Sequence, residues 1–214
     1  HLYQMDDSDV VHFHHDSGAD VTVAVKPVPR EQASEFGILK TDASNRIVEF
    51  REKPPEGELD SLMSDTGDPS RPFLASMGIY VFNRGLLVRL LSTENREDFG
   101  RHVIPYAINV LNVKGYLFNG YWEDIGTIKS FFRANLALTD PLPAFDLYRR
   151  EKPIYTRPRY LPPSSVNGCS VKRSMICEGC IIDTCEIERS IIGIRSRIAP
   201  HCSLKNVIMM GADS

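Results

Sequence analysis

Two short segments carry side chains that are well suited to chemistry, and the first is Glu52-Lys53-Pro54. It closes a run of strand character that ends at the proline. Ligands of open α/β sheets gather at strand ends. A lysine there can hold a phosphate as a compact positive charge, and a neighbouring carboxylate can accept hydrogen bonds from sugar hydroxyls. The alternative interpretation is an exposed ion pair, which contributes about 0 to 1 kcal/mol to stability.

The second segment covers residues 121–127, Tyr-Trp-Glu-Asp-Ile-Gly-Thr. A strand runs into Glu123 and Asp124, Gly126 then permits a tight turn, and Thr127 can cap the helix that follows. Mg²⁺ prefers one or two carboxylates together with water and substrate phosphates, so Asp124 is a candidate metal ligand. The alternative is that Asp124 caps the helix.

Strand-like and helix-like stretches alternate up to residue 138. These elements would position the two candidate segments described above. The sequence predicts helices over 6–16 and 99–110 and from residue 127, and strands over 20–25, 36–40, 46–51, 74–82 and 114–122. Turn formers at 42–45 join two of these strands into a hairpin. The acidic stretch 55–70, rich in Pro and Gly, indicates a mobile surface loop. Alternation of this kind favours an α/β sheet domain with helices on its faces.

The rest of the chain follows a different pattern. Prolines crowd residues 141–163 and indicate an extended connector over 139–165. Beyond it, aliphatic residues recur at steps of six, apart from one interval of ten that Ile187 divides. They are Ile176, Ile182, Ile187, Ile192, Ile198 and Leu204. This pattern is typical of a left-handed parallel β-helix made of hexapeptide turns, and the alternative is a run of ordinary short strands.

Composition excludes several classes of protein. The chain has 214 residues, 42% of them hydrophobic and 25% charged, as in globular proteins. The net charge of −3 provides no basic excess for nucleic acid. Apolar runs are too short to span a bilayer. All five cysteines lie between residues 169 and 202, and an odd number without a signal segment indicates reduced thiols in a cytosol-like compartment.

Two groups of residues are of types that commonly ligate metal ions. Three histidines lie within residues 12–15. On a helix His12 and His15 would share a face, but no third ligand of suitable spacing lies nearby, and we expect surface histidines. Cys177 and Cys180, with Cys185, resemble half of a zinc site. We expect instead that these small side chains fill the narrow interior of the β-helix.

Several segments occur in the order found in ADP-glucose pyrophosphorylase (glucose-1-phosphate adenylyltransferase), and the chain resembles that family. The segments are Glu35-Phe36-Gly37, Glu52-Lys53-Pro54, residues 75–82, Asp98-Phe99-Gly100 with Val103-Ile104-Pro105, and residues 121–127. Residues 152–163 and 193–198 resemble its cyanobacterial and plastid forms in particular. The resemblance implies a partial Rossmann-like, GT-A-like nucleotidyltransferase domain over 1–138, a Pro-rich connector over 139–165 and a truncated left-handed β-helix over 166–214.

The resemblance also implies a reaction. Glucose 1-phosphate would attack the α-phosphorus of ATP and give ADP-glucose and pyrophosphate for glycogen or starch synthesis. Lys53 and Asp124 would be the catalytic residues, Lys53 by holding the sugar phosphate and Asp124 as one of two Mg²⁺ ligands. In the family, the Gly-rich nucleotide loop and the first metal aspartate precede the segment that begins here at His1. We therefore expect an internal fragment that is inactive by itself.

Further roles follow from the same resemblance. Gly37, Glu52, Ser76 and Trp122 would contact the sugar, together with Lys53. Arg159 would contact a regulatory anion between the two domains, and its alternative role is a structural salt bridge. The expected assembly is a homotetramer, or a plant-like heterotetramer, in the bacterial cytoplasm or the plastid stroma.

Three other functions compete with this hypothesis. One is a non-catalytic regulatory subunit of the same family, and another is a different sugar-1-phosphate nucleotidyltransferase. The third, a hexapeptide acyltransferase, needs a long regular solenoid with a catalytic histidine between coils. His201 is the one histidine in that region, so the sequence disfavours this class.

Overall fold

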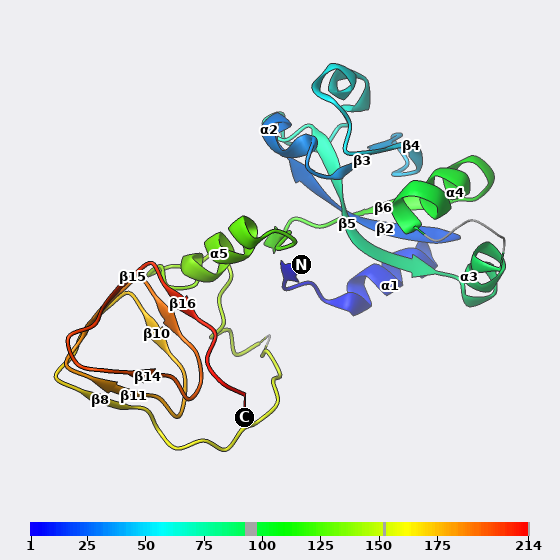
Figure 1. Cartoon of the computed structure of the whole chain (residues 1–214). Coiled ribbons are helices and arrows are strands. Elements are labelled where there is room, and N and C mark those ends of the chain that lie inside the picture. Colours follow the sequence, from blue (N-terminus) through cyan, green and yellow to red (C-terminus); the bar gives the residue numbers. More distant parts are fainter. Residues whose placement is uncertain (93–97, 152, 214) are drawn as a thin grey trace. The chain divides into compact units, whose positions relative to one another are not determined.

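The computed structural model describes residues 1–92, 98–151 and 153–213. The chain forms two compact units, one over Met5–Trp122 and the other over His1–Gln4 with Glu123–Ser214. In Figure 1 the first contains the mixed sheet with its helices, and the second contains the triangular β-helix. The fold is thus an α/β domain followed by a left-handed β-helix.

The unit Met5–Trp122 is built on a five-stranded sheet of order β4-β3-β5-β2-β6. Its strands are β2 (Val21–Val28), β3 (Gly37–Thr41), β4 (Ile47–Glu52), β5 (Phe73–Phe82) and β6 (Val113–Leu117). Its helices are α1 (Asp7–Asp16), α2 (Arg30–Ala33), the 3₁₀ helix η1 (Glu56–Leu62), α3 (Arg84–Leu91), the π-helical turn η2 (Phe99–Val103) and α4 (Ile104–Val110). β2 and β6 are parallel, and the other neighbouring strands are antiparallel.

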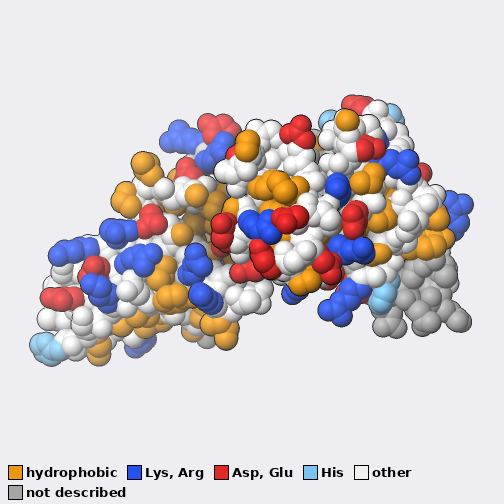
Figure 2. Space-filling model, turned by 90° about the horizontal axis from the view of Figure 1, so that it is seen from above, with side chains coloured by type: hydrophobic (Ala, Val, Ile, Leu, Met, Phe, Trp, Pro, Cys, Tyr) orange, Lys and Arg blue, Asp and Glu red, His pale blue; other side chains and the backbone are white. Residues whose placement is uncertain are grey.

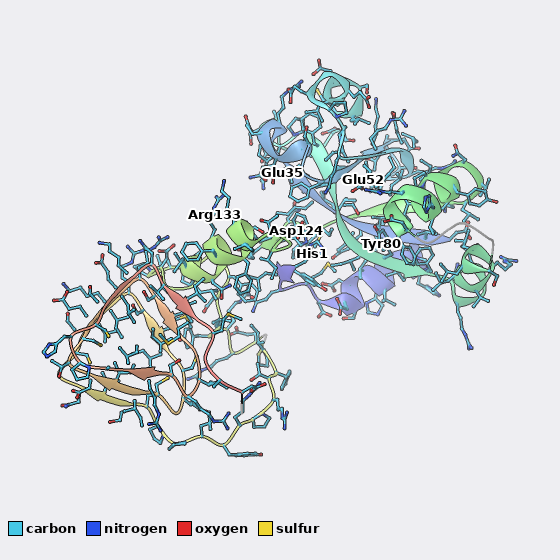
Figure 3. All side chains as sticks on the ribbon, viewed as in Figure 1. His1, Glu35, Glu52, Tyr80, Asp124 and Arg133 are labelled. Atoms are coloured by element: carbon cyan, nitrogen blue, oxygen red, sulfur yellow. The ribbon has the colours of Figure 1, made fainter. Side chains whose placement is uncertain are left out.

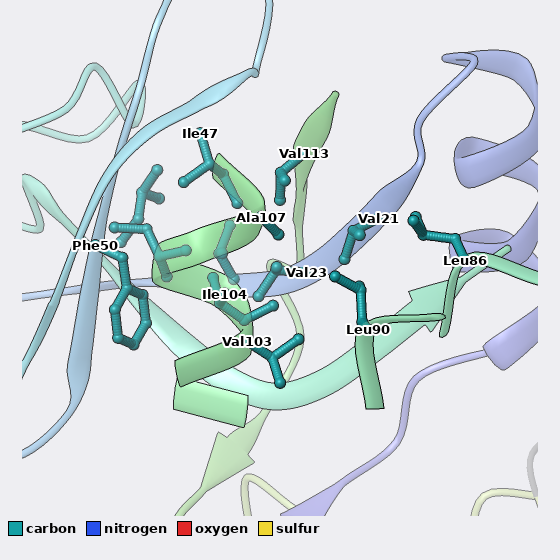
Figure 4. Close-up of a cluster of buried hydrophobic side chains, with 13 residues drawn as sticks. Val21, Val23, Ile47, Phe50, Leu86, Leu90, Val103, Ile104, Ala107 and Val113 are labelled. Atoms are coloured by element: carbon teal, nitrogen blue, oxygen red, sulfur yellow. The ribbon is translucent and has the colours of Figure 1, made fainter. Parts of the chain in front are cut away.

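Alternate residues of these strands enter two separate cores, as a period of two requires. The larger core lies under α3, η2 and α4, and Figure 4 shows it. Its members from the helices include Leu86, Leu90 and Ile104. The second core lies under α2 and η1 and contains strand residues that point to the other face of the sheet. Leu39, for example, enters the first core and Ile38 the second.

The expectation of a loop over residues 55–70 is wrong for its first part, where η1 lies. Leu59 and Leu62 are fully buried in the second core. Arg30 anchors the segment, because its guanidinium donates to Glu56 Oε1 and to Asp60 Oδ1 at 2.6 Å each. The many acidic residues of this stretch therefore line the exposed side of a segment whose two leucines are in the core.

The strand expected over 114–122 is shorter than predicted. β6 ends at Leu117, and β7 (Trp122–Glu123) begins after a break. Lys26 Nζ donates to the carbonyl of Gly120 at 2.5 Å within that break. The other expected strands and helices of this unit are confirmed, with the helix predicted over 99–110 starting as the π turn η2.

The second unit contains α5 (Ile128–Ala137) and the β-helix, and β1 (Leu2–Tyr3) pairs with β7. The β-helix has three parallel sheets of three strands each. They are β8 (Ser165–Asn167), β11 (Ile181–Asp183) and β14 (Arg197–Ile198); β9 (Ser170–Lys172), β12 (Glu186–Glu188) and β15 (Ser203–Lys205); and β10 (Met175–Ile176), β13 (Ile191–Ile192) and β16 (Ile208–Met209).

Register in these sheets explains the aliphatic period. Ile182 pairs with Val166 and Ile198, each 16 residues away, whereas Ile187 and Leu204 are 17 apart. Each coil has three sides, so one side takes slightly fewer residues on average than the six of the sequence pattern. Between Ile182 and Ile192 two sides of five residues follow each other, with Ile187 between them.

Residues in the left-handed conformation form the corners of the β-helix. Equivalent positions in successive coils have a positive φ whether or not they are glycine. The three sets are Gly168, Thr184 and His201; Arg173, Arg189 and Asn206; and Gly179, Arg195 and Gly211. A tight turn between flat sides requires this conformation, so the corners impose it even on residues with a side chain.

No helix among the described residues is long and apolar enough to cross a membrane. The face seen in Figure 2 has basic and acidic side chains interspersed. This agrees with the nearly balanced charge of the sequence.

Candidate functional site

The end of the β3–β4 hairpin brings three of the predicted site residues together. Gly37 at the start of β3 is the register partner of Glu52 at the end of β4. The next backbone N–H, that of Lys53, donates to the carbonyl of Phe36 at 3.0 Å. Lys53 has a φ of +47°, so the chain leaves the strand through a left-handed residue. This turn breaks the strict alternation that would place Glu52 and Lys53 on opposite faces.

Two glycines leave space around the Glu52 carboxylate. A β-carbon at Gly37 would lie 2.8 Å from Glu52 Oε2 and 2.7 Å from Phe50 Cζ. A β-carbon at Gly100, in η2, would lie 3.3 Å from the same Glu52 oxygen. The carboxylate therefore sits between two backbone segments that approach it closely because neither carries a side chain.

Ser76 lies on β5, two strands from β4 in the sheet, and interacts with Tyr80. β5 carries a bulge here, because Val23 pairs with Tyr80 and Val25 with Ser76. A bulge re-aims side chains, and these two residues form a side-chain hydrogen bond. Burial raises the pKa of Tyr80, the hydrogen bond with Ser76 opposes the rise, and the charges of Glu52 and Asp98 add to it.

Tyr80 and Asp98 also belong to this region, although neither was expected as a site residue from the sequence. Asp98 caps η2 by accepting the N–H of Arg101 at 2.8 Å, and the Tyr80 ring stacks on Phe99 with centroids 5.4 Å apart. Figure 3 labels Glu52 and Tyr80. The motif Asp98-Phe99-Gly100 was visible in the sequence, but no local pattern places it next to Glu52.

Trp122 is a further aromatic group of this region. Its side chain is buried and packs against Phe36 with ring centroids 5.1 Å apart. Phe36 immediately precedes Gly37, so Trp122 contacts the residue beside the start of β3. The unit Met5–Trp122 thus carries five of the predicted residues, Gly37, Glu52, Lys53, Ser76 and Trp122, at or near one end of the hairpin and its neighbouring strand.

Asp124 belongs to the other compact unit and lies in the turn before α5. Its Oδ1 accepts the N–H of Gly126 at 3.0 Å and lies 3.8 Å from His1 Nδ1. Thr127 caps α5 through a reciprocal capping box with Ser130. The prediction for Thr127 is therefore confirmed, and the alternative in which Asp124 caps the helix is wrong, because Asp124 closes the preceding turn instead.

Comparison with protein families decides the class of the molecule. Residues 1–141 match the family model described as nucleotidyl transferase. The chain belongs to the nucleotidyl transferase family. Residues 159–214 match the model described as the GLGC left-handed parallel beta-helix domain. The second match coincides with the β-helix of this nucleotidyl transferase.

Arg159 of this nucleotidyl transferase lies in the connector and has a definite partner. Its Nε donates to Asp213 Oδ1 at 2.9 Å, and its Nη1 donates to the carbonyl of Arg157. The hydrogen bond with Asp213 raises the pKa of the Arg159 guanidinium. Asp213 also approaches Arg195, whose Nη1 donates to the Asp213 carbonyl at 2.6 Å.

One histidine and two cysteines of the nucleotidyl transferase are buried. His12 and His15 are exposed as expected, but His14 is buried, and its Nδ1 lies 2.8 Å from Thr22 Oγ1. Its position on the inner side of α1 explains this difference. Cys180 and Cys185 are buried inside the β-helix, which confirms the interpretation of small interior side chains for these two, whereas Cys177 is partly exposed. Within the described part of the chain, no group of three or more His, Cys, Asp or Glu residues could hold a metal ion.

Proposed function

We propose that the chain is part of a glucose-1-phosphate adenylyltransferase, which makes ADP-glucose and pyrophosphate from ATP and glucose 1-phosphate in glycogen or starch synthesis. The observation that carries the proposal is the surroundings of Glu52. Its carboxylate fits against two glycines whose missing side chains make room for it, and next to it lie Tyr80 and the exposed Lys53. Hydrogen-bond acceptors beside a cation suit a phosphorylated sugar.

Each residue of the hairpin end has a role in this proposal. Lys53 neutralises the sugar phosphate, and Glu52 accepts hydrogen bonds from the glucose hydroxyls. Gly37 lets the backbone approach the sugar, and Ser76 adds a hydroxyl contact. Trp122 provides an apolar wall for the sugar ring.

The chemistry needs no side-chain nucleophile. A phosphate oxygen of glucose 1-phosphate attacks the α-phosphorus of ATP, the bond from that phosphorus to the bridging oxygen breaks, and pyrophosphate leaves. Positioning of the two substrates and neutralisation of their charge supply most of the catalysis in transfers of this type. Lys53 and Asp124 are the proposed catalytic residues, because both act on phosphate charge.

Asp124 is the proposed ligand for Mg²⁺. Its carboxylate fits an ion that takes one or two carboxylates and completes its shell with water and substrate phosphates. The described residues form no larger ligand set, so the fit is to a substrate-dependent ion rather than to a protein cage. A bound Mg²⁺ would neutralise phosphate charge.

The remaining parts of the proposal concern organisation. We assign residues 1–138 to the catalytic domain, 139–165 to the connector and 166–214 to the β-helix. Arg159 is the proposed contact for a regulatory anion, which would have to compete with Asp213. A homotetramer, or a heterotetramer of plant-like type, in the bacterial cytoplasm or plastid stroma completes the proposal.

Binding of glucose 1-phosphate to the purified chain, measured by isothermal titration calorimetry, tests the sugar site. A charged hydrogen bond contributes about 1.5 to 3 kcal/mol, so Lys53→Ala should weaken binding about 10-fold to 100-fold. Lys172→Ala, which removes an exposed lysine of the β-helix, is the matched control and should leave binding unchanged. Equal affinity for glucose 6-phosphate, or no effect of Lys53→Ala, would contradict the proposed site.

Substrate choice is tested on the full-length parent protein with ATP, UTP and dTTP as nucleotide donors. Preference for ATP with glucose 1-phosphate supports the adenylyltransferase. Preference for another nucleotide would identify a different sugar-1-phosphate nucleotidyltransferase. Tight binding of glucose 1-phosphate without turnover of any nucleotide would indicate a regulatory subunit.

A further inference from the structure

Three of the five cysteines occupy the same position in successive coils of the β-helix. Cys169, Cys185 and Cys202 each immediately precede a strand of one sheet, β9, β12 and β15. The first residues of these strands are register partners, Ser170 with Glu186 and Glu186 with Ser203. The N–H of Ser170 donates to the carbonyl of Cys185 at 2.9 Å, so the coils are in contact at this position.

Two of these thiols are already in contact. Cys185 donates its S–H to the sulfur of Cys169, and the two Sγ atoms are 3.3 Å apart. Neighbouring parallel strands lie about 4.8 Å apart. This spacing falls inside the range of about 4.4 to 6.8 Å that disulfides span between α-carbons. We propose that Cys169 and Cys185 are a site of reversible oxidation, at which a disulfide joins the first two coils of the β-helix.

Exposure assigns the two thiols different parts in the reaction. Cys169 is partly exposed, whereas 5% of Cys185 is accessible. Burial is the main reason that the pKa of Cys185 rises to about 11, and the hydrogen bond with Cys169 adds to it. An oxidant therefore reaches Cys169 first, and Cys185 is the resolving thiol that closes the disulfide.

With a peroxide as oxidant, the atoms and electrons balance in two steps. The Cys169 sulfur attacks hydrogen peroxide, the O–O bond breaks, and a sulfenic acid and one water form. The Cys185 sulfur then attacks the Cys169 sulfur, the S–O bond breaks, and the hydroxide leaves with the proton of Cys185 as a second water. The two thiols have lost two electrons, and the peroxide has gained them.

The other cysteines are placed differently. The thiol of Cys180 donates to the carbonyl of Gly193 at 3.1 Å on the interior side. Cys177 is partly exposed and lies outside the three equivalent positions. Cys202 is the third member of the set and also raises the pKa of Cys185 through its charge. The contact of 3.3 Å favours Cys169 over Cys202 as the partner of Cys185.

Mass spectrometry of the purified, fully reduced chain tests the proposal. The chain is treated with hydrogen peroxide, alkylated, and digested with trypsin and a glutamyl endopeptidase. Two of the five thiols should be lost, which leaves three, and the peptide of residues 160–172 should be joined to that of 179–186. Fragmentation should place the link on Cys185 rather than Cys180, and dithiothreitol should restore all five thiols.

Two variants sharpen the result. Cys169→Ser should abolish the cross-link, while Cys177→Ser, which removes a partly exposed thiol outside the set, should leave it intact. Because the cross-link itself is measured in the unaltered chain, a folding defect of a variant does not affect the test. The proposal is overturned if Cys169 oxidises past the sulfenic acid while Cys185 stays a thiol. A link that joins Cys185 to Cys202, or one chain to another, overturns it as well.

Discussion

A β-carbon at Gly37 would lie 2.8 Å from Oε2 of Glu52, so the carboxylate occupies the space that a side chain at position 37 would fill. The register of β3 and β4 creates this contact, because it places the two residues opposite each other. Glycine at position 37 is therefore a condition for the observed position of the Glu52 carboxylate.

Gly37→Ala should displace the Glu52 carboxylate and the Phe50 ring. Overpacking of this kind costs about 1 to 3 kcal/mol of stability. Glucose 1-phosphate binding should weaken as well, because the carboxylate no longer points to the proposed sugar site. Gly57→Ala, which meets no atom within 4 Å, is the matched control. Calorimetric titration and denaturant unfolding measure both effects, and a variant that binds normally would contradict the role of Gly37.

Lys53 allows its charge and its backbone to be tested separately. A left-handed residue with a side chain costs about 1 to 2 kcal/mol. Lys53→Gly should therefore be more stable than Lys53→Ala by about 1 kcal/mol in urea unfolding, since Lys53 has a φ of +47°. Both variants should lose affinity for glucose 1-phosphate to the same extent, because both lack the ammonium group. Unequal loss would show that the backbone, and not the charge, governs binding.

Asp68 should make stability depend on pH in the acid range. Hydrogen bonds from the Ser70 hydroxyl and from Arg71 lower its pKa from 3.8 to about 2. A carboxyl with a depressed pKa in the folded state stabilises the fold above the unfolded pKa, and this contribution is lost as the pH falls from 3.8 toward 2. Carbon-detected NMR titration should show a midpoint near 2 for Asp68.

Ser70→Ala is the informative variant for this prediction. It removes the largest cause of the shift, so the Asp68 midpoint should move back toward 3.8. Asp68→Asn should lose less stability than the unaltered chain as the pH falls from 3.8 toward 2, because the variant lacks this carboxyl. An unchanged midpoint in Ser70→Ala would contradict the assigned cause.

His201 tests the left-handed corners of the β-helix. It has a φ of +65°, at the position that Gly168 occupies in an earlier coil. His201→Gly should be at least as stable as the natural chain, although glycine gains entropy in the unfolded state. His201→Val should lose about 1 to 2 kcal/mol, because a β-branched residue tolerates this conformation poorly. As a control in an extended strand, Ser203→Gly should lose about 0.5 to 1 kcal/mol of stability. Thermal unfolding of the three variants measures their order of stability.

Local patterns predicted much of the fold. Alternation along 36–40 and 46–51 identified the hairpin of β3 and β4, and Thr127 identified the start of α5. The recurring isoleucines identified the β-helix, because every interior position needs an apolar residue. The same reasoning failed for Leu59 and Leu62, since a charged neighbourhood conceals two buried residues.

By itself the sequence determined the element types, the family resemblance and the segments that could hold a phosphate or a cation. These depend on residues close together in the chain, where backbone geometry sets the period. Only the tertiary structure decided that Asp98 and Tyr80 lie near Glu52, and that Cys169 touches Cys185. Such neighbours depend on the strand order β4-β3-β5-β2-β6 and on a coil of 16 to 17 residues. Both arise from how elements pack together, which no local period encodes.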